Sequence, residues 1–250
     1  MLGLPAHVTA CLFDLDGVLT QTARVHNSAW AETFDAFLRQ WADAHGKPFV
    51  PYDPGPDYNR YVDGRPRADG VRTFLASRGI QLPEGTPDDP PSANTVNGVG
   101  NRKNEILLRR IHTDGVQVYD GSVAYLHAAA RAGLRRAVVS ASANCRDVVA
   151  SAGLEDLLEV RVDGIVAAQR GLRGKPHPDT FLAAAEQLGV KPDQAAVFED
   201  ALSGVEAGRG GGFGFVVGVD RVGQATALRE HGATIVVADL AELLTGEDAS

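Results

Sequence analysis

The chain has 250 residues, a formal net charge of −8 and 44% hydrophobic residues. This length can bury one sizeable core, or a core with a smaller second domain. The acidic balance argues against a nucleic-acid partner, which would require a basic surface. The two cysteines, Cys11 and Cys145, cannot build a disulfide framework. Because no apolar stretch reaches membrane-spanning length and residues 1–8 lack the features of a secretory signal, we expect a cytoplasmic protein without a membrane partner.

An apolar run that ends in two aspartates stands near the start of the sequence. Residues 10–13 are apolar, and Asp14, Leu15, Asp16 and Gly17 follow them, which predicts a buried strand that ends in a turn. Side chains alternate along a strand, so Asp14 and Asp16 are expected on one face, at the end of the strand where α/β proteins bind ligands. Two carboxylates so close need a cation or a shared proton, and oxygen ligands suit magnesium. The alternative is a turn that is acidic by chance.

The stretch from residue 25 to about residue 113 shows helical patterns and no clear strand. Its first predicted helix spans residues 25–41, because apolar residues that we expect to pack in a core recur three and four positions apart: Trp30, Phe34, Phe37, Leu38 and Trp41. Further helices are predicted over residues 68–78 and 102–112, on either side of a proline-rich loop at 82–97.

After residue 118 the pattern changes to helices that alternate with strands. The predicted strands span residues 136–139, 160–162, 195–198, 213–217 and 234–237. The predicted helices span residues 122–132, 146–151, 178–188, 202–208 and 223–230. Such alternation is typical of a parallel sheet with right-handed crossovers. We therefore predict the α/β class: a doubly wound parallel sheet in a core domain of residues 1–22 and 117–250, with an α-helical cap domain inserted at residues 23–116.

A glycine-rich run at residues 208–214 has the composition of a phosphate-binding loop. Such a loop has to follow a strand and open a helix. This run instead follows a predicted helix and precedes a predicted strand. We therefore interpret it as a helix stop followed by a turn.

Four segments at the predicted strand ends carry polar residues. They are Asp14 with Asp16, the run Ser140-Ala141-Ser142-Ala143-Asn144, Lys175 before Pro176, and Glu199 with Asp200. The hydroxyl groups of the second segment, and the helix N-terminus that follows it, can donate hydrogen bonds to an anion. Each segment alone could be an ordinary loop. Together, at the carboxyl ends of successive strands, they predict one ligand site.

The same four motifs resemble those of the haloacid dehalogenase superfamily, whose members are phosphotransferases and related enzymes with an aspartate nucleophile. The resemblance covers the whole predicted core. Within the superfamily the chain looks most like the β-phosphoglucomutase group, and the run at residues 140–144 resembles the second motif of that group. Three further features carry this resemblance: His26, Gly64-Arg65-Pro66-Arg67 and Asn101-Arg102-Lys103-Asn104.

The resemblance implies a role for each core motif. Asp14 is implied as the nucleophile, which forms an aspartyl phosphate, and Asp16 as the general acid and base. A Mg²⁺ ion is implied, with these metal-binding residues: Asp14, Asp16 through its carbonyl, Asp200, and Glu199 as a further ligand or a support. The groups implied to hold the phosphoryl oxygens are Ser140, the Ala141 amide and Lys175.

The resemblance also implies interconversion of β-glucose 1-phosphate and glucose 6-phosphate through β-glucose 1,6-bisphosphate, so a second phosphate must be held. Arg67 is the candidate for that distal phosphate, because a guanidinium forks onto phosphate oxygens. The remaining implied site residues are Ser142 and Asn144 from the core, Lys103 from the cap, Thr22 as the hinge, and His26, which would orient Asp16. Without the resemblance, the favoured interpretation of His26 is a helix-start residue with local partners; the resemblance reverses that preference.

Two positions depart from the family pattern, and two other functions are open. Ala143 stands where the second motif usually has lysine, and Gln21 stands where aspartate is common; Arg146 or Lys103 could supply the missing cation. One alternative function is a phosphatase of the same family, in which water attacks the aspartyl phosphate. The other is a sugar-phosphate-binding protein, which an intact nucleophile motif disfavours. We expect a monomer whose ligand is a small phosphorylated sugar.

Overall fold

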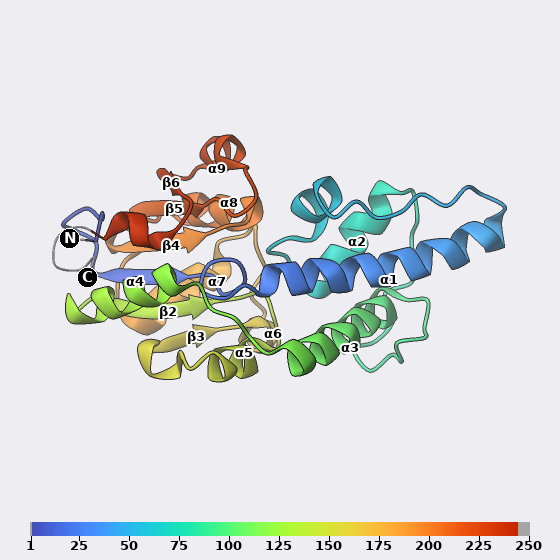
Figure 1. Cartoon of the computed structure of the whole chain (residues 1–250), viewed down its shortest axis with the longest axis horizontal. Helices are drawn as coiled ribbons and strands as arrows, with labels where there is room; N and C mark the ends of the chain where they lie inside the picture. Colours follow the sequence, from blue (N-terminus) through green and yellow to red (C-terminus); the bar gives the residue numbers. More distant parts are fainter. Residues whose placement is uncertain (1, 245–250) are drawn as a thin grey trace. The chain divides into compact units, whose positions relative to one another are not determined.

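The computed structural model describes residues 2–244 (Figure 1), and the chain divides into two compact units. Residues 1–21 and 116–250 form one, called here the core unit, and residues 22–115 form the other, called here the cap unit. Each junction lies one residue earlier than the sequence placed it, because Thr22 already begins helix α1 (Thr22–His45). No helix within residues 2–244 is both long enough and apolar enough to cross a membrane.

The core unit contains one sheet of six parallel strands in the order β3-β2-β1-β4-β5-β6. The strands are β1 (Ala10–Phe13), β2 (Arg135–Val139), β3 (Val160–Val162), β4 (Ala195–Glu199), β5 (Phe215–Val219) and β6 (Ile235–Val237). The order runs outward in both directions from the central pair β1 and β4, which is the doubly wound topology that the sequence predicted. Phe13 lies opposite both Val138 and Phe198, so the carboxyl ends of β1, β2 and β4 are level with one another.

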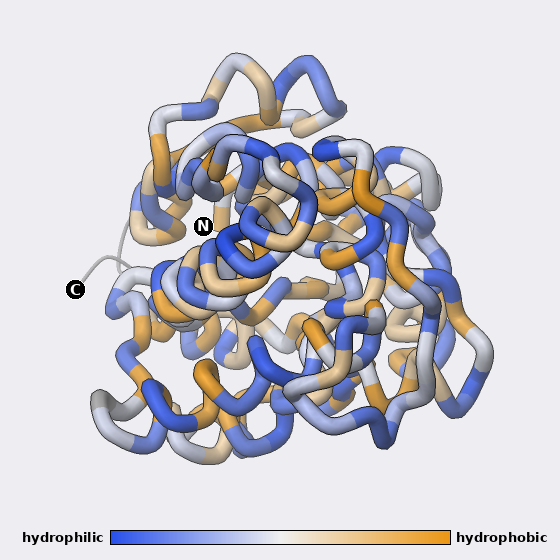
Figure 2. Tube along the Cα trace, turned by 90° about the vertical axis from the view of Figure 1, so that its right-hand side faces the viewer, coloured by the Kyte–Doolittle hydropathy of each residue, from blue (hydrophilic) through white to orange (hydrophobic). Residues whose placement is uncertain are grey.

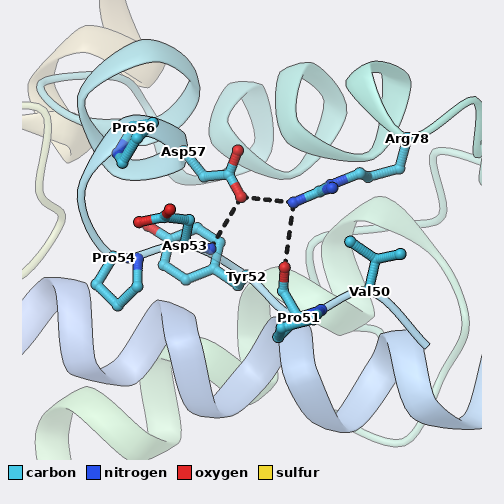
Figure 3. Close-up of a pocket in the computed structure, with 8 residues that line it drawn as sticks. All are labelled: Val50, Pro51, Tyr52, Asp53, Pro54, Pro56, Asp57 and Arg78. Atoms are coloured by element: carbon cyan, nitrogen blue, oxygen red, sulfur yellow. Dashed lines mark hydrogen bonds and ion pairs between the residues drawn. The ribbon is translucent and has the colours of Figure 1, made fainter.

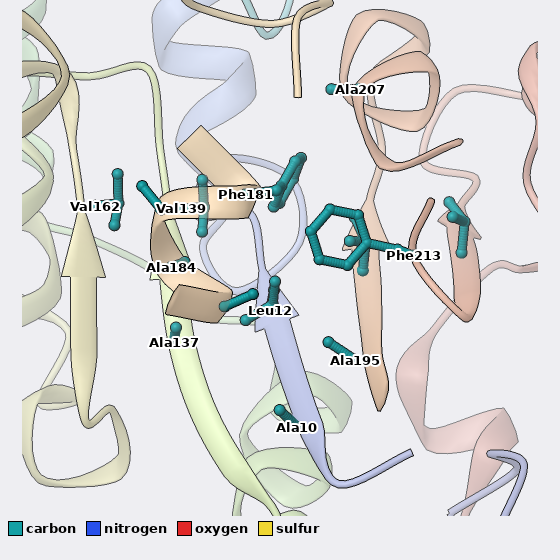
Figure 4. Close-up of a cluster of buried hydrophobic side chains, with 14 of the residues drawn as sticks. Ala10, Leu12, Ala137, Val139, Val162, Phe181, Ala184, Ala195, Ala207 and Phe213 are labelled. Carbon is teal, nitrogen blue, oxygen red and sulfur yellow. The ribbon is translucent and has the colours of Figure 1, made fainter. Parts of the chain in front are cut away.

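Helices cover both faces of this sheet. They are α4 (Asp120–Arg131), α5 (Cys145–Ser151), α6 (Gly164–Arg170), α7 (Asp179–Leu188), α8 (Leu202–Gly210) and α9 (Ala225–His231). On one face, Leu12 of β1 packs with Phe181 of α7 in a cluster rich in alanine and valine (Figure 4). On the other face, Phe13 stacks on Phe198 with ring centroids 4.5 Å apart, and Tyr125 of α4 meets Phe13 edge-on. Burial on both faces explains why β1 is apolar at every position.

The cap unit is helical. It contains α1, a π-helical turn at Tyr58–Val62, α2 (Arg67–Ser77) and α3 (Val96–Asp114). Its core is aromatic: Phe34 packs against the rings of Trp30 and Phe74, with centroids 4.8 Å and 4.1 Å away. The apolar residues predicted to form a stripe on the first helix are buried there, except that Trp41 is half-buried. Figure 2 shows the corresponding alternation of hydrophobic and hydrophilic positions along the helices.

Several elements differ from their prediction. Helix α1 is longer than the predicted 25–41, and the π-helical turn was not predicted. Helix α3 begins at Val96 instead of residue 102, because the Thr95 side chain caps it by accepting a hydrogen bond from the Gly98 amide. Helix α6 was not predicted, since its seven residues are too few to show a helical period. Strand β5 begins two residues later than predicted, and the glycine-rich run before it forms the end of α8 and a turn, as expected.

Candidate active site

Lys175 joins the carboxyl ends of three strands of the core unit. Its buried ammonium donates a hydrogen bond to Asp14 Oδ1, just beyond β1, and another to the Val139 carbonyl of β2 at 3.1 Å. It also forms an ion pair with Glu199 Oε1 of β4 at 2.5 Å. Three motifs that are far apart in the sequence therefore meet at one ammonium group.

The charges of this cluster shift one another's pKa values. Burial alone would lower the pKa of Lys175, but Asp14 and Glu199 hold it above its ordinary value. Burial raises the pKa of Asp14 well above its usual range; Lys175 opposes this shift, whereas Glu199 and Asp16 add to it. Lys175 therefore stays charged, and Asp14 lies where further positive charge would favour its ionised, nucleophilic form.

Asp14, Glu199 and Asp200 make a buried carboxylate cluster. Each offers an oxygen atom, and these atoms all lie within 4.8 Å of one another. Hard oxygen donors at this spacing suit a divalent cation such as Mg²⁺, and the repulsion between like charges in so small a buried space favours its binding. The residues present therefore fit a metal ion. Asp16, the other predicted metal-binding residue, is half-buried and close enough to Asp14 to raise its pKa.

Gly17 allows the first motif to approach this cluster. Its φ is +90°, a backbone conformation that favours glycine. A Cβ atom at this position would lie 1.8 Å from Asp200 Oδ2. The turn after Asp16 therefore needs a glycine for two independent reasons, its dihedral angle and the close approach of the Asp200 carboxylate.

The loop of residues 140–144 follows β2 directly and is shaped by its own hydroxyl groups. Ser140 Oγ accepts a hydrogen bond from the Ser142 amide, and Ser142 Oγ accepts one from the Asn144 amide, both at 3.1 Å. Ser140 is buried and adjoins Val139, whose carbonyl Lys175 contacts. Ser140 and Ala141 thus start beside the Lys175 ammonium, whereas Ala143 is exposed.

The predicted cap residues form two groups within the cap unit. Lys103 is buried; its ammonium lies 3.1 Å from His26 Nδ1 and 5.1 Å from the centre of the Trp30 ring. Thr22 is buried at the first position of α1. Arg67, the first residue of α2, is half-buried, and burial lowers its pKa. Its guanidinium has no hydrogen-bond or ion-pair partner among the described residues.

A hollow on the cap unit contains a second arginine, Arg78, whose contacts differ from those of Arg67 (Figure 3). Its volume is ≈ 610 Å³, and it is lined by Val50, Pro51, Tyr52, Asp53, Pro54, Pro56, Asp57 and Arg78. The Arg78 guanidinium in it is already engaged, since it donates to Asp57 at 2.6 Å and to the Pro51 carbonyl at 3.2 Å. The hollow therefore carries no cation that is as available to an anion as Arg67.

One strand-end segment was overlooked in the sequence. Asp220 and Arg221 directly follow β5, and the side chains of Arg221 and Gln224 contact the main chain of the site: Arg221 donates to the Gly17 carbonyl at 2.8 Å and Gln224 to the Asp200 carbonyl at 2.9 Å. The rule that found the other motifs, polar residues at a strand end, would have found this one. It failed because the predicted strand ended at residue 217, two residues early.

The sequence and the structure of this chain are similar to those of several known proteins. Residues 8–212 match the profile of the haloacid dehalogenase-like hydrolases. The chain is 59% identical to a β-phosphoglucomutase of Mycobacterium bovis, over 98% of this chain and 94% of that protein. It is 31% identical to a validoxylamine A 7'-phosphate phosphatase of Streptomyces hygroscopicus subsp. limoneus, over 93% and 94% of the two chains. A solved β-phosphoglucomutase structure from Clostridium difficile superposes with a TM-score of 0.73 at 25% identity, covering 95% of this chain and 93% of that chain.

Proposed function

The chain belongs to the haloacid dehalogenase-like hydrolase family, and we propose that within this family it is a β-phosphoglucomutase. It interconverts β-D-glucose 1-phosphate and glucose 6-phosphate through an aspartyl-phosphate enzyme and β-glucose 1,6-bisphosphate. Near full-length similarity to the Mycobacterium bovis enzyme supports this proposal. In the structure, the observation that carries it is the buried Asp14 carboxylate held by Lys175 beside Glu199 and Asp200.

Asp14 is the nucleophile in this proposal. One of its oxygens attacks phosphorus, the bond from phosphorus to the sugar oxygen breaks, and an aspartyl phosphate forms. Lys175 orients the carboxylate and supplies positive charge next to the transferring group, and the Ser140 hydroxyl with the Ala141 amide donates to the phosphoryl oxygens. Positioning and charge stabilisation of this kind provide most of the rate in phosphoryl transfer.

Asp16 moves the proton. As the aspartyl phosphate forms, protonated Asp16 gives its proton to the sugar oxygen that leaves. In the second half-reaction the Asp16 carboxylate takes the proton from the sugar hydroxyl that attacks the phosphoenzyme. Its half-buried position beside Asp14 supports this role, and such acid–base help is typically worth about 10²–10⁴-fold.

Asp14, the Asp16 carbonyl and Asp200 would hold Mg²⁺, with Glu199 as a further ligand or as a support. When bound, the ion would supply positive charge that lets two anions, the attacking carboxylate and the phosphoryl group, approach each other. The buried carboxylate cluster supports this assignment. Glu199 also has a fixed structural role, since its Oε2 accepts a hydrogen bond from the Ala201 amide at 3.0 Å.

The distal phosphate of the bisphosphate binds Arg67. A half-buried guanidinium without an acidic partner among residues 2–244 supports this assignment, because a phosphate would replace the water that burial removes. Ser142, Asn144 and Lys103 add polar contacts to the sugar phosphate. His26, next to Lys103, orients Asp16, and Thr22 is the hinge residue at the start of α1.

A phosphatase acting on a small sugar phosphate is the second candidate, and the likeness to the Streptomyces phosphatase favours it. It would use the same nucleophile, with water in place of the sugar hydroxyl in the second step. A coupled assay with β-glucose 1-phosphate and magnesium separates the two, with and without a β-glucose 1,6-bisphosphate primer. The mutase proposal expects glucose 6-phosphate to exceed free phosphate; free phosphate as the main product would contradict it.

A further inference from the structure

The loop at residues 220–225, which follows β5, is held rigid by a single carboxylate. Asp220 Oδ1 accepts hydrogen bonds from the amides of Val222, Gly223 and Gln224, at 3.3, 2.7 and 2.8 Å. Its second oxygen accepts one from the Ala225 amide at 3.1 Å. Four backbone donors on one side chain fix the shape of the loop, and with it the starting points of the side chains that the loop carries.

Arg221 projects from this loop onto the turn that follows Asp16. Its Nε donates to the Gly17 carbonyl at 2.8 Å, and one terminal nitrogen lies 3.4 Å from the Val18 carbonyl. The other terminal nitrogen donates to the Ala238 carbonyl at 2.7 Å. The guanidinium also stacks on Tyr119, 3.5 Å from the ring centre. Only 13% of the side chain is exposed, so the guanidinium is fixed from several sides.

Gln224, from the same loop, contacts the segment that carries Asp200. Its Nε2 donates to the Asp200 carbonyl at 2.9 Å. Neither Gln224 nor Arg221 contacts a reacting carboxylate in the structure. Gln224 binds a main-chain carbonyl, and Arg221 binds main-chain carbonyls and the Asp239 carboxylate, 3.2 Å away. Their targets are nevertheless adjacent, since the Gly17 backbone packs against the Asp200 carboxylate. One rigid loop therefore holds the two segments that meet there.

We propose that Arg221 is a positioning residue, which holds the turn at Gly17 and Val18 so that the Asp16 carboxyl meets the oxygen of the leaving group. Gln224 fixes the Asp200 segment against the same turn. The inference rests on the role proposed above for Asp16. Inside the turn, the Gly17 amide donates to the Thr20 carbonyl at 2.7 Å. From outside, Ser122 Oγ donates to the Val18 carbonyl at 2.7 Å, and Arg221 binds the carbonyl of Gly17, the residue next to Asp16.

The leaving group provides the test. When β-glucose 1,6-bisphosphate phosphorylates Asp14, the bond to the sugar oxygen breaks and Asp16 gives that oxygen its proton. When acetyl phosphate phosphorylates Asp14, acetate leaves as a stable anion and needs no proton. A residue that positions Asp16 should therefore matter for the first donor and much less for the second. A residue that only stabilises the fold should affect both donors equally.

Arg221→Met is compared with Arg136→Met in the full-length, magnesium-loaded enzyme. Arg136 is a matched control: its side chain is 14% exposed and donates to the carbonyls of Leu134 and Leu157, at the other end of the sheet. Single-turnover transfer of phosphate to the enzyme is measured with both donors, and thermal melts are recorded. Both variants should melt earlier than the wild type.

In Arg221→Met we expect the ratio of the sugar-phosphate rate to the acetyl-phosphate rate to fall about tenfold or more, since a ~1 Å misplacement can cost about 10²-fold. Arg136→Met should leave this ratio unchanged. Arg221→Lys, which keeps the charge but cannot fork between the carbonyls, should fall between the wild type and Arg221→Met. If Arg221→Met is poorly folded, the ratio of the two rates in Arg221→Lys provides the test instead.

An unchanged ratio in Arg221→Met or Arg221→Lys, or a change matched by Arg136→Met, would overturn the proposal. Failure of the mutase function looks different. In that case the wild-type enzyme forms no glucose 6-phosphate, and the same comparison of leaving groups is made with β-glycerophosphate as the alkyl phosphate.

Discussion

In the core unit, the buried charges of the candidate site face one another: the Lys175 ammonium contacts both Asp14 and Glu199. In the cap unit, the Arg67 guanidinium is half-buried and pairs with no described residue. The first arrangement gathers three carboxylates around one ammonium and suits an added cation. The second is a cation that burial destabilises, and it suits an added anion. The two units are thus prepared for ligands of opposite charge.

A second cation of the cap unit sharpens this comparison. Lys103 is buried, but it has a neighbour in His26 and lies over the Trp30 ring. Both of these neighbours belong to the cap unit. A substrate phosphate would be a new partner for Arg67, whereas it would add to contacts that Lys103 already has. We therefore expect a bound phosphorylated ligand to change the contacts of Arg67 more than those of Lys103.

The largest effect is expected from Asp14→Asn. An amide cannot form an aspartyl phosphate, so all transfer should stop. The control is Asp163→Asn, at another buried aspartate of the core unit, which accepts a hydrogen bond from the Val166 amide and pairs with Arg161. Mass spectrometry of trapped phosphoenzyme gives the measurement. A phosphoryl group found on any residue other than Asp14 would refute the assignment.

Removal of divalent cations should abolish turnover almost as completely. The buried oxygens of Asp14, Glu199 and Asp200 lie within 4.8 Å of one another, an arrangement that repels a phosphate dianion unless a cation is present. Activity is measured in excess chelator and again after Mg²⁺ is restored in excess. Undiminished turnover in chelator would mean that the carboxylate cluster holds no metal during the reaction.

Gly17→Ala should be more harmful than another substitution at a glycine with positive φ. A Cβ at Gly17 would collide with Asp200 Oδ2, whereas a Cβ at Gly133, where φ is +73°, would meet nothing within 4 Å. Both variants lose about 1–2 kcal/mol of stability from backbone strain. Only Gly17→Ala should also raise the Mg²⁺ concentration for half-maximal activity. Equal Mg²⁺ requirements in the two variants would contradict the close packing of Gly17 on the metal cluster.

Arg67→Ala should separate the two candidate activities. A charge-assisted hydrogen bond to phosphate is worth roughly 1.5–3 kcal/mol, and about 1.4 kcal/mol corresponds to a tenfold change in rate. Mutase turnover should therefore fall at least about tenfold, whereas phosphate release from acetyl phosphate, which has no second phosphate, should hardly change.

Arg72→Ala is the control for Arg67→Ala, because Arg72 lies on the same helix and pairs with Asp69 and Glu84 at the surface. Thermal melts check that both variants fold. Equal losses of both activities in Arg67→Ala would make Arg67 a structural residue. No loss of either activity would place the distal phosphate elsewhere.

The smallest effect is expected from thiol reagents. Cys145 is the first residue of α5, a position that lowers a thiol pKa, but burial raises the pKa of Cys145, and also that of Cys11, well above the usual range. Thiolate is therefore scarce at neutral pH. The native enzyme should keep its activity in iodoacetamide, and both thiols should react after denaturation. Rapid inactivation of the native enzyme would show that one of them is accessible.

The core motifs could be predicted because their polar side chains stand at sequence positions where an α/β fold places its ligand site. Asp14, Lys175, Glu199 and Asp200 are polar residues at the ends of apolar strands or just before a helix, and a parallel sheet brings such ends together. The early start of α3 was harder to predict from the sequence. Two glycines near the start of α3, Gly98 and Gly100, favour a turn by local preference. In the structure they allow close contacts with Ala93 and Arg67.

Arg221 shows what local reasoning could not supply. Its contacts with Gly17 and Val18 join residues that are 204 and 203 positions apart, and no local pattern connects them. The two-residue error in the end of β5 then removed the one available signal, since Arg221 no longer followed a strand directly. That Arg67 pairs with none of the described residues could not be predicted either, because it depends on the position of every acidic residue of the folded cap unit.

The position of β1 in the sheet has a consequence for how the protein is made. Residues 10–13 pair with residues 135–138 on one side and 195–198 on the other. Translation adds roughly 5–20 residues per second, so the first strand waits on the order of ten seconds for its first neighbour. All of residues 22–115 are synthesised in that interval. Chain growth therefore favours early assembly of the aromatic cluster around Phe34, while the fully buried strand β1 still lacks the strands with which it pairs.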